Sequence, residues 1–454
     1  MRKRTHIRNI TLMLIVAIGA GYWYLSTPDK ATVDVAKLTG PGPELVGQRP
    51  QKFPTVKIAK LVGWNAGTTP VAARGLEVTQ FAGGLDHPRW LHLLPNGDVL
   101  VAESSAPKRP VGGLQDWIGR KLISKAGGAN PSADRITLLR DTNGDGVADQ
   151  RSVLLDGLKS PFGMALKEET LFVANTDAVM AFRFKPGDLK ISAKGEKLFD
   201  LPAGVPNNHW ARNLILDPSG ESLYVTIGSN SNIGENGMET EKNRAEIKQY
   251  EFKTKSLISY AYGLRNPNGL AFNPISKTLW AVVNERDMLG SDGPPDYLTT
   301  VDFGTFYGWP FTYWGGIEDQ RVPQVRPDLK QYTKRPNYAL GPHVAPLGLA
   351  FSKGASLGAG FANGAFVGLH GSWNRVPQSG YKVVYIPFNE RGYPTGAKPV
   401  DVLSGFLNDK GEAQGRPAGV IFDSAGGLLV ADDAGNRIWR VTASIAAKTA
   451  LSSQ

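Results

Sequence analysis

The chain has 454 residues and a formal net charge of +10, and 41% of its residues are hydrophobic, enough for one large folded domain or a few smaller ones. It contains no cysteine, so disulfides, thiolate metal sites, cysteine nucleophiles and covalently attached haem are excluded. The basic residues are scattered and form no arginine-rich arm or basic motif with interleaved aromatics, so we expect no nucleic-acid partner.

The N-terminus has the pattern of an export signal. It begins with the basic residues Arg2, Lys3, Arg4 and Arg8, followed by the uncharged stretch "ITLMLIVAIGAGYWYL". This stretch is slightly shorter than the roughly 20 residues of a spanning helix, and no clean Ala-x-Ala cleavage site follows. For residues 1–28 we therefore favour an uncleaved membrane anchor over a cleaved signal peptide. The positive-inside rule then predicts that the remaining chain lies on the periplasmic side of the inner membrane.

The rest of the chain divides into a lead-in and a folded body. Residues 29–74 are rich in proline, glycine, threonine and lysine and show weak periodicity, which predicts a linker and lead-in. Residues 75–445 are predicted to form the folded body. Short apolar runs there are bounded by turns such as Pro-Asn-Gly and Pro-Ser-Gly, which predicts many short antiparallel strands.

One pattern recurs six times in this body: a turn, a short apolar strand, a tight turn and a second apolar strand. The copies are "GLDHPRWLHLLPNGDVLVAE", "GLKSPFGMALKEETLFVAN", "HWARNLILDPSGESLYVTIG", "GLRNPNGLAFNPISKTLWAVV", "APLGLAFSKGASLGAGFANGAFVGLHG" and "RPAGVIFDSAGGLLVADD". Further strands such as "RITLLRD" and "YKVVYIPF" follow several copies. Units of roughly sixty residues with three or four strands predict an all-β, six-bladed β-propeller. A two-sheet sandwich would explain the strands but not the six similar units.

Two insertions interrupt the repeats. Residues 105–133 include an amphipathic helical stretch around Trp117 to Ile123, and residues 309–344 are rich in proline, tryptophan and tyrosine. In a propeller such insertions lie at the rims, so we expect them to wall a pocket.

The stretch "DTNGDGVAD" matches the first half of a calcium-binding loop. Asp141, Asn143, Asp145 and Asp149 occupy relative positions 1, 3, 5 and 9, and a glycine at position 6 permits the sharp turn. Position 12, which should be a bidentate glutamate, is Ser152. Two interpretations stay open: a structural calcium site, or an Asn-Gly-rich hairpin turn without an ion.

Histidine is scarce, with six in the chain, and no paired spacing indicates a histidine-based metal site. His209, in "PNNHWARNLIL", lies in a polar turn directly before a strand, and in a propeller this position faces the channel mouth. A lone histidine is usually structural, but this position favours a general base active near neutral pH.

Equivalent positions in other repeats carry arginines. "GLRNPNGLAF" and "GRPAGVIF" place Arg265, Asn266 and Arg416 where the third repeat places His209. If the repeats superpose, these side chains converge on one end of the channel. Two arginines and a histidine there suit an anionic ligand, because guanidinium groups bind carboxylates bidentately. The alternative is that each arginine ties loops together through backbone carbonyls.

Five stretches, taken in order, resemble the soluble pyrroloquinoline quinone-dependent sugar dehydrogenases, most closely the L-sorbosone and aldose dehydrogenase branch. They are "NNHWARNLILDPSGESLYVTIG", "YGLRNPNGLAFNP", "NERD", "YGWP" and "GRPAGVIFDSAGGLLVADDAGNRIWRV". The resemblance runs from about Gly75 to Val441 and implies a six-bladed propeller that binds pyrroloquinoline quinone and Ca²⁺ at the channel mouth.

The resemblance also implies roles for single residues. His209 is the base that takes the substrate hydroxyl proton while hydride passes to the quinone. Arg265 and Asn266 contact the cofactor, and Arg416 pairs with its carboxylate or stabilises the developing quinol anion. Calcium polarises the quinone carbonyl as a Lewis acid.

The chain departs from these relatives at three places. The residue before the histidine base is Asn208, where the glucose-oxidising relatives have aspartate. Arg286 and Asp287 stand where those relatives offer Gly-Pro carbonyls to calcium, so the carbonyls of this pair or the Asp287 carboxylate are the expected ligands. A lysine that relatives place against the cofactor falls near "HGSWNR", which leaves His370 or Arg375 as its substitute. Glucose specificity is therefore not implied.

We thus expect a membrane-anchored periplasmic quinoprotein that oxidises an aldose or a sugar-derived aldehyde such as sorbosone. Electrons are expected to pass to an external acceptor, a cytochrome or a membrane quinone. Two alternatives stay open. One is a calcium-dependent propeller lactonase, which needs Asp, Glu and Asn at the inner-strand starts, two of which are arginine here. The other is a non-enzymatic envelope propeller that binds glycans or envelope proteins.

Overall fold

The computed structural model of the protein describes residues 13, 14, 16, 17, 19, 29–51, 55–108 and 131–444. Apart from a few positions, the predicted signal or anchor lies outside these residues, and so does the predicted helical stretch around Trp117. In the part of the chain that the structure describes, no helix is long and apolar enough to cross a membrane.

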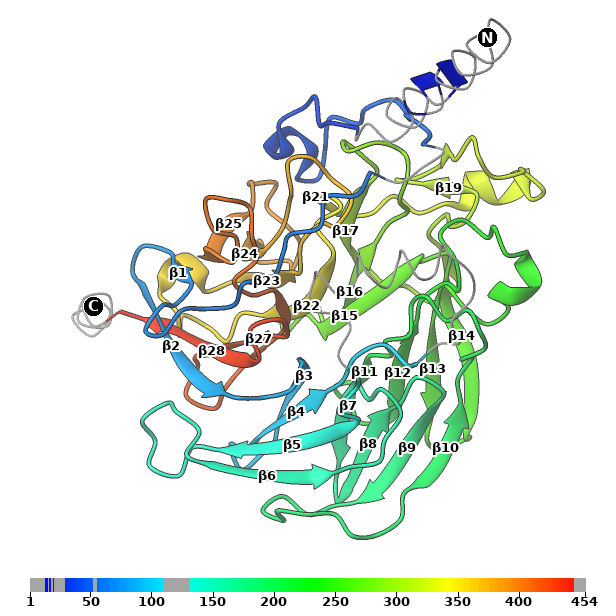
Figure 1. Ribbon diagram of the computed structural model, residues 1–454. Coiled ribbons are helices and arrows are strands. Elements are labelled where there is room, and N and C mark those ends of the chain that lie inside the picture. The colour runs from blue at the N-terminus through cyan, green and yellow to red at the C-terminus, as the bar shows by residue number, and fades with distance from the viewer. Residues whose placement is uncertain are drawn as a thin grey trace, which may run out of the picture.

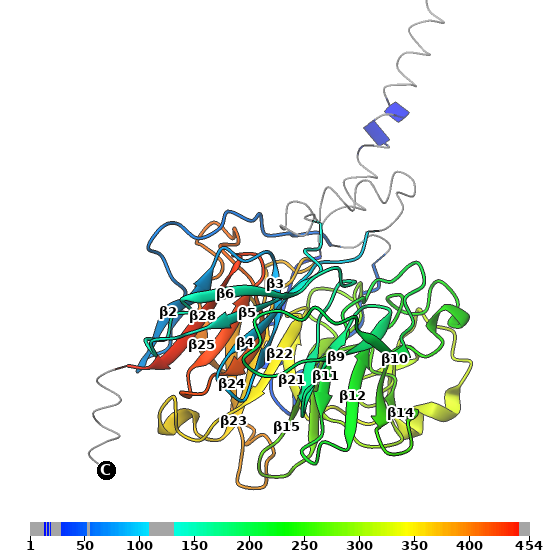
Figure 2. The ribbon, with the colours of Figure 1, turned by 90° about the horizontal axis from the view of Figure 1, so that it is seen from below.

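Six antiparallel sheets form the blades of a propeller around a central channel (Figure 1). Each sheet has one innermost strand, and these six strands contact one another in a closed ring: β3 with β7, β7 with β11, β11 with β15, β15 with β22, β22 with β26, and β26 with β3. The turned view shows the same sheets side by side (Figure 2). The predicted six-bladed, all-β propeller is therefore confirmed.

The first three blades follow the chain order. The first contains β3 (Pro88–Leu93), β4 (Val99–Glu103), β5 (Arg135–Arg140) and β6 (Gln150–Leu155). The second contains β7 (Met164–Lys167), β8 (Thr170–Ala174), β9 (Ala178–Arg183) and β10 (Glu196–Asp200). The third contains β11 (Leu214–Leu216), β12 (Ser222–Ile227), β13 (Glu246–Glu251), β14 (Ser256–Tyr262) and, in parallel at its outer edge, β18 (Thr305–Phe306).

The last three blades include strands brought in from elsewhere in the chain. The fourth contains β15 (Asn266–Phe272), β16 (Leu279–Asn284), β17 (Pro295–Thr300) and β21 (Tyr338–Pro342). The fifth contains β22 (Pro346–Phe351), β23 (Gly364–Leu369), β24 (Lys382–Pro387), β25 (Val400–Ser404) and β1 (Val71–Ala72). The sixth contains β26 (Pro417–Phe422), β27 (Leu428–Asp432), β28 (Arg437–Ala443) and β2 (Leu76–Gly83).

The ring is closed by the two ends of the folded body. Strand β2, from its start, pairs antiparallel with β28, from its end, in a register from Leu76 opposite Ala443 to Gly83 opposite Arg437. The sixth blade therefore needs both chain ends, and this pairing joins the first blade to the last.

The predicted insertion over residues 309–344 is shorter than expected. It contains a small hairpin of β19 (Thr312–Tyr313) and β20 (Ile317–Glu318) and a 3₁₀ helix, η3 (Pro327–Tyr332). Its last part is β21, the outermost strand of the fourth blade, so the insertion ends before Tyr338. The proline and glycine in "YALGP" concealed this strand, because an edge strand tolerates proline that a central strand does not.

The lead-in over residues 29–74 packs along the propeller. Gly40 forms a β-bridge with Ala339, and the amide of Arg49 donates to the carbonyl of Leu289 at 3.0 Å. One short 3₁₀ helix, η1 (Val35–Leu38), lies within it; η2 (Met238–Glu241) and η4 (Ala359–Phe361) lie in blade connections. Extended proline-rich backbone can thus cover the blades without periodic apolar residues.

The apolar core lies between adjacent blades. Trp280 and Val282 of β16, for example, pack with Ala365 and Val367 of β23, and all four side chains are fully buried. Burial of these faces stabilises the blade contacts and fixes the inner strands relative to one another. Loops at the ends of the inner strands are thereby held on a rigid frame.

Candidate active site

The predicted site residues lie at one end of the channel. His209, Arg265 and Arg416 precede the inner strands β11, β15 and β26, while Asp287 and Asp433 follow the second strands β16 and β27. Because these strands are antiparallel, the start of the first and the end of the second lie at the same end of a blade. The fold therefore gathers these loops at one channel mouth.

The ring of His209 is oriented by Ser229, on the loop after β12. Its Nδ1 atom lies 2.8 Å from the carbonyl oxygen of Ser229 and 3.0 Å from the Ser229 hydroxyl oxygen. That hydroxyl donates to the carbonyl of Ser231, so both Ser229 oxygens act as acceptors. Nδ1 therefore carries the hydrogen, and Nε2 keeps the lone pair that a base needs.

The His209 imidazole is neutral at physiological pH. Burial and, after it, the positive charge of Arg265 lower its pKa to about 3. Gly228 also keeps the ring close to Asn266, since a Cβ at Gly228 would lie 2.5 Å from both the Asn266 side-chain oxygen and the His209 Cβ. His209, Arg265 and Asn266 are thus brought together as predicted from the repeats.

The segment carrying His209 is fixed by two buried arginines. Arg212 donates to the carbonyl of His209 at 2.6 Å. Arg212 and Arg244 also share two acceptors, the carbonyl of Pro202 and the side-chain oxygen of Asn207. Burial lowers the pKa of Arg212 to about 9, and the nearby Arg244 contributes to this shift.

Asp287 is the centre of a first polar cluster at the mouth. Its carboxylate accepts hydrogen bonds from the Arg265 guanidinium at 2.9 Å and from the side-chain amide of Asn374 at 2.7 Å. Nδ1 of His343 lies 3.6 Å from the same carboxylate. Burial alone would raise the pKa of Asp287, but Arg265 and His343 hold it well below its usual range. Burial likewise opposes charging of His343, yet Asp287 raises the pKa of His343 above its ordinary value.

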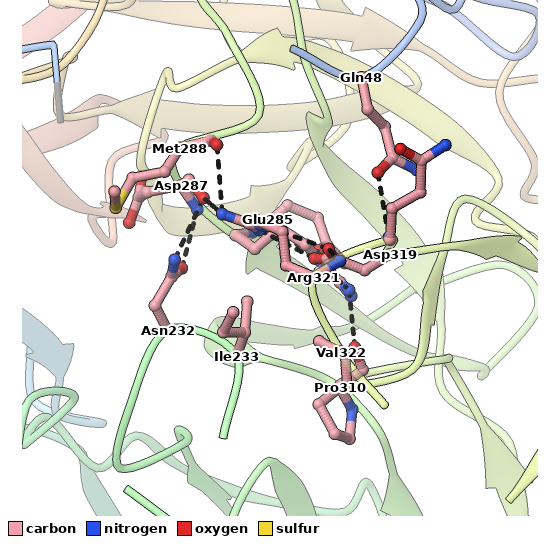
Figure 3. Close-up of polar contacts among 12 residues, drawn as sticks. Gln48, Asn232, Ile233, Glu285, Asp287, Met288, Pro310, Asp319, Arg321 and Val322 are labelled. Carbon is pink, nitrogen blue, oxygen red and sulfur yellow. Dashed lines mark hydrogen bonds and ion pairs between the residues drawn. The ribbon is translucent and has the colours of Figure 1, made fainter. Parts of the chain in front are cut away.

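Asn232 and Arg321 hold the loop that carries Asp287 (Figure 3). The side chain of Asn232 accepts from the Asp287 amide at 2.8 Å and donates to its carbonyl at 3.1 Å. Arg321 donates to the carbonyls of Asp287 and Met288. The carboxylate is therefore presented from a fixed backbone.

Asp433 is the centre of a second polar cluster, across the sixth and first blades. Its carboxylate lies 2.8 Å from Nε2 of His370, pairs with Arg89, and lies 3.8 Å from Nε2 of His87. Burial lowers the pKa of His370 to about 4, with a further contribution from Arg416. The Arg89 guanidinium also lies 5.7 Å from the centre of the Trp210 ring, next to His209.

The other predicted cofactor-binding arginines donate to loop carbonyls. Arg416 donates to the carbonyls of His370 and Gly371 at 3.0 and 2.7 Å. Arg375 is buried and donates to the carbonyls of Ser291 and Pro377. These contacts match the alternative of arginines as loop ties, and they also fix where the positive charges lie around the mouth.

The described side chains do not form a calcium site at Arg286 and Asp287. The Arg286 guanidinium is fully buried and bonds to Glu285 and to the carbonyls of Pro310 and Thr312. The Asp287 carboxylate is already taken by cationic and amide partners. Among the residues that the structure describes, no group of three or more His, Cys, Asp and Glu side chains could hold a metal ion.

The turn over residues 141–149 lies at the opposite end of the first blade, between β5 and β6. Asp141 accepts from the amides of Gly144 and Gly146 at 2.7 and 2.8 Å, and Asp149 accepts from Thr142. Asn143 and Asp145 bond to each other, the amide nitrogen donating to the carboxylate at 3.1 Å. These side-chain oxygens stabilise the turn itself, as expected for a hairpin turn without an ion. Calcium binding at this turn stays a prediction.

An anionic cofactor fits the donor set at the mouth. The Nε atom of Arg89 is buried and has no hydrogen-bond partner among the described residues. Together with Arg265 and Arg416, it makes this end of the channel rich in guanidinium donors. The residues that sequence reasoning missed are Arg89, Asn232, His343, Asn374 and Asp433. Two of them could have been found from the sequence. Arg89 in "HPRW" and Asp433 in "VADD" stand at the same positions of their repeats as the predicted residues do in theirs.

The chain matches the family model described as TrAA12-like over residues 132–296 and 328–444. It is 22% identical to the pyrroloquinoline quinone-dependent pyranose dehydrogenase of Coprinopsis cinerea over 428 residues, covering 81% of this chain and 54% of the relative. The chain therefore spans about half the length of that relative.

Two solved structures share the fold. The holo form of the pyranose dehydrogenase PQQ domain from Coprinopsis cinerea has a TM-score of 0.65 at 19% identity, covering 85% of this chain and 100% of that domain. The calcium structure of the Trichoderma reesei family AA12 carbohydrate-active enzyme has a TM-score of 0.67 at 18% identity, covering 86% of this chain and 99% of that one. At these identities the likeness establishes the propeller fold.

Proposed function

Because the chain belongs to the TrAA12-like family of pyrroloquinoline quinone-dependent sugar dehydrogenases, which are oxidoreductases, we propose that it oxidises an aldose or a sugar-derived aldehyde with this quinone. The observation that carries the proposal is the geometry of His209. Its ring is fixed through Nδ1 and offers a neutral Nε2 at a mouth surrounded by arginines.

In this proposal the chain's residues bind the cofactor and move one proton. The bound quinone supplies a hydride acceptor. Nε2 of His209 accepts the proton of the substrate C1 hydroxyl, which for an aldehyde is that of its hydrate. The Ser229 carbonyl keeps Nδ1 protonated and stabilises the imidazolium that forms.

The positive charges serve the anionic cofactor. Arg89, Arg265 and Arg416 would hold a tricarboxylate by charge-assisted hydrogen bonds. A bound anion also raises the pKa of His209 from its value of about 3 toward neutrality, because it stabilises the protonated ring. A base with a pKa nearer the working pH is more effective.

We include Ca²⁺ as a second cofactor on the strength of the calcium structure of the Trichoderma reesei protein. The side chains described around Asp287 do not fit this ion, because Arg265 and Asn374 already satisfy the carboxylate. No step is therefore assigned to calcium, and its contribution is left to the titration below.

An aldose substrate is supported by the aldose sugar dehydrogenase of Escherichia coli, which is 26% identical over 166 residues, 33% of this chain and 42% of the relative; the sorbosone-like alternative comes from the sequence resemblance alone. Transfer of electrons to an external cytochrome or quinone follows from the absence of cysteine for covalent haem. Anchoring at the periplasmic face is supported by the N-terminal sequence pattern. A lactonase is less favoured, since the Asp287 and Asp433 carboxylates at the mouth are paired with Arg265 and Arg89.

The test uses the full chain purified without cofactor. Sugar-dependent reduction of an artificial dye is followed while pyrroloquinoline quinone is titrated in, with and without Ca²⁺. We expect saturable activity that requires the quinone. Quinone binding without turnover on aldoses or sorbosone would leave a binding propeller, and no quinone binding would overturn the proposal.

A further inference from the structure

The loop after β23 exposes a single large aromatic side chain. Trp373 is 39% exposed, although Gly371, Ser372, Asn374 and Arg375 around it are all buried. An indole with this exposure in an otherwise buried loop leaves apolar surface in contact with water. Whether this surface stays accessible depends on how firmly the backbone of the loop is held.

The two polar clusters hold this loop from both sides. On one side His370 bonds to Asp433 at 2.8 Å, and on the other Asn374 bonds to Asp287 at 2.7 Å. Trp373 lies between these two anchors in the sequence. The loop therefore bridges the fourth and sixth blades across the fifth, at the channel mouth.

The backbone of the loop is also fixed. The Ser372 carbonyl accepts from the Tyr381 hydroxyl at 2.7 Å, and the Trp373 carbonyl accepts from the amide of Lys57 at 2.8 Å. Arg416 holds the carbonyls of His370 and Gly371. With so many bonds, the loop is not free to fold over the indole, so the exposed ring is held open.

We propose that Trp373 is the platform on which the sugar ring packs. The C–H face of a pyranose is apolar and matches an indole in size. A tryptophan on a fixed loop offers this contact with little loss of side-chain entropy. The proposal rests on the proposed dehydrogenase function for the identity of its ligand.

The test measures sugar binding apart from turnover. The dissociation constants of D-glucose, D-galactose and D-xylose are measured by calorimetry on the quinone-loaded full chain, for wild type, Trp373→Ala and Trp373→Phe. Phe303→Ala is the control, because Phe303 is 66% exposed but follows β17 at the other end of its blade. The dissociation constant of the quinone is measured for every variant.

We expect Trp373→Ala to weaken the best-bound sugar about tenfold, as an aromatic contact of ordinary strength requires. Trp373→Phe should recover most of this loss. KM should rise while kcat stays within about twofold of the wild-type value. This combination is the signature of a binding contact that the ground state and the transition state share. Phe303→Ala and the quinone affinities should not change.

Three outcomes would overturn the inference: unchanged sugar affinity in Trp373→Ala, an equal loss of quinone affinity, or no sugar binding by the wild type. Sugar binding that depends on Trp373 without any dye reduction would instead contradict the dehydrogenase function and leave the platform standing. The two proposals therefore fail separately.

Discussion

Nδ1 of His209 lies 2.8 Å from the carbonyl oxygen of Ser229, and this contact decides which nitrogen of the ring can act as a base. The carbonyl cannot donate, so the proton is on Nδ1 and Nε2 is free to accept. The Ser229 hydroxyl, at 3.0 Å, is a second and dispensable acceptor.

The pair His209→Gln and Ser229→Ala separates these roles. We expect His209→Gln to lower kcat by about 10²- to 10⁴-fold, the usual worth of general base catalysis. Ser229→Ala keeps the backbone carbonyl and should lower kcat less than about threefold. Steady-state dye reduction at saturating quinone measures both. Comparable losses in the two variants would contradict a carbonyl-fixed base.

The buried arginines behind His209 should matter for both stability and rate. Arg212→Met leaves the carbonyls of His209 and Pro202 without this donor in a buried site, and we expect it to lower the free energy of unfolding by about 3 kcal/mol. It should also lower kcat, because His209 loses its backbone anchor. Urea unfolding and dye reduction measure the two effects.

Arg326→Gln is the matched control for that substitution. Arg326 pairs with Asp328 on an exposed part of η3, so its removal should leave the free energy of unfolding nearly unchanged. If Arg212→Met resembled Arg326→Gln, Arg212 would not hold the segment.

The contact between Arg265 and Asp287 can be measured by a double-mutant cycle. Each partner is buried or nearly so, and removing one leaves the other unpaired. We expect Arg265→Gln and Asp287→Asn to be strongly destabilising alone, with a coupling energy of about 1 to 3 kcal/mol in the double variant. Additive losses in urea unfolding would show that the pair contributes no coupling.

His92 gives a pH prediction away from the active site. It lies on β3 at the far end of the channel, and burial lowers its pKa from 6.5 to about 4. Between these pH values the unfolded chain binds a proton there and the folded chain does not. Its contribution to stability is therefore present above pH 6.5 and is lost as the pH falls toward 4, by at most about 1.4 kcal/mol per pH unit.

His92→Asn should remove this dependence. The difference in free energy of unfolding between wild type and variant, followed from pH 7.5 to pH 4, isolates His92 because every other group titrates in both proteins. We expect the difference to change across this range in the direction that favours the variant at low pH. A constant difference would mean that His92 is equally solvated in both states.

Local turn chemistry and apolar alternation were enough to predict the six blades. The pairing of β2 with β28 was not predicted. It joins residues more than 350 positions apart, and the sequence of neither strand indicates which strand it pairs with. Likewise the sequence "YALGP" alone does not predict a strand, because it becomes one only by pairing with β17 at the outer edge of the fourth blade.

The site was predicted where one residue type stood at a repeat position, as with His209 and Arg265. It was missed where the role depends on a partner from another blade. Asp433 gains its role only because His370 and Arg89 arrive from the fifth and first blades. Spacing along the chain does not report such contacts, nor does it show that the Asp287 carboxylate is already occupied.

In the proposed reaction the channel mouth oxidises a sugar with a bound quinone while His209 takes the proton. Its most direct measurement is a single turnover: full chain loaded with one equivalent of pyrroloquinoline quinone is mixed with D-glucose, D-galactose or D-xylose without an electron acceptor, and the cofactor absorbance is followed. We predict stoichiometric conversion to the quinol spectrum with at least one sugar, slowed by about 10²-fold or more in His209→Gln. An unchanged quinone spectrum with all three sugars, or the same rate in His209→Gln, would contradict it.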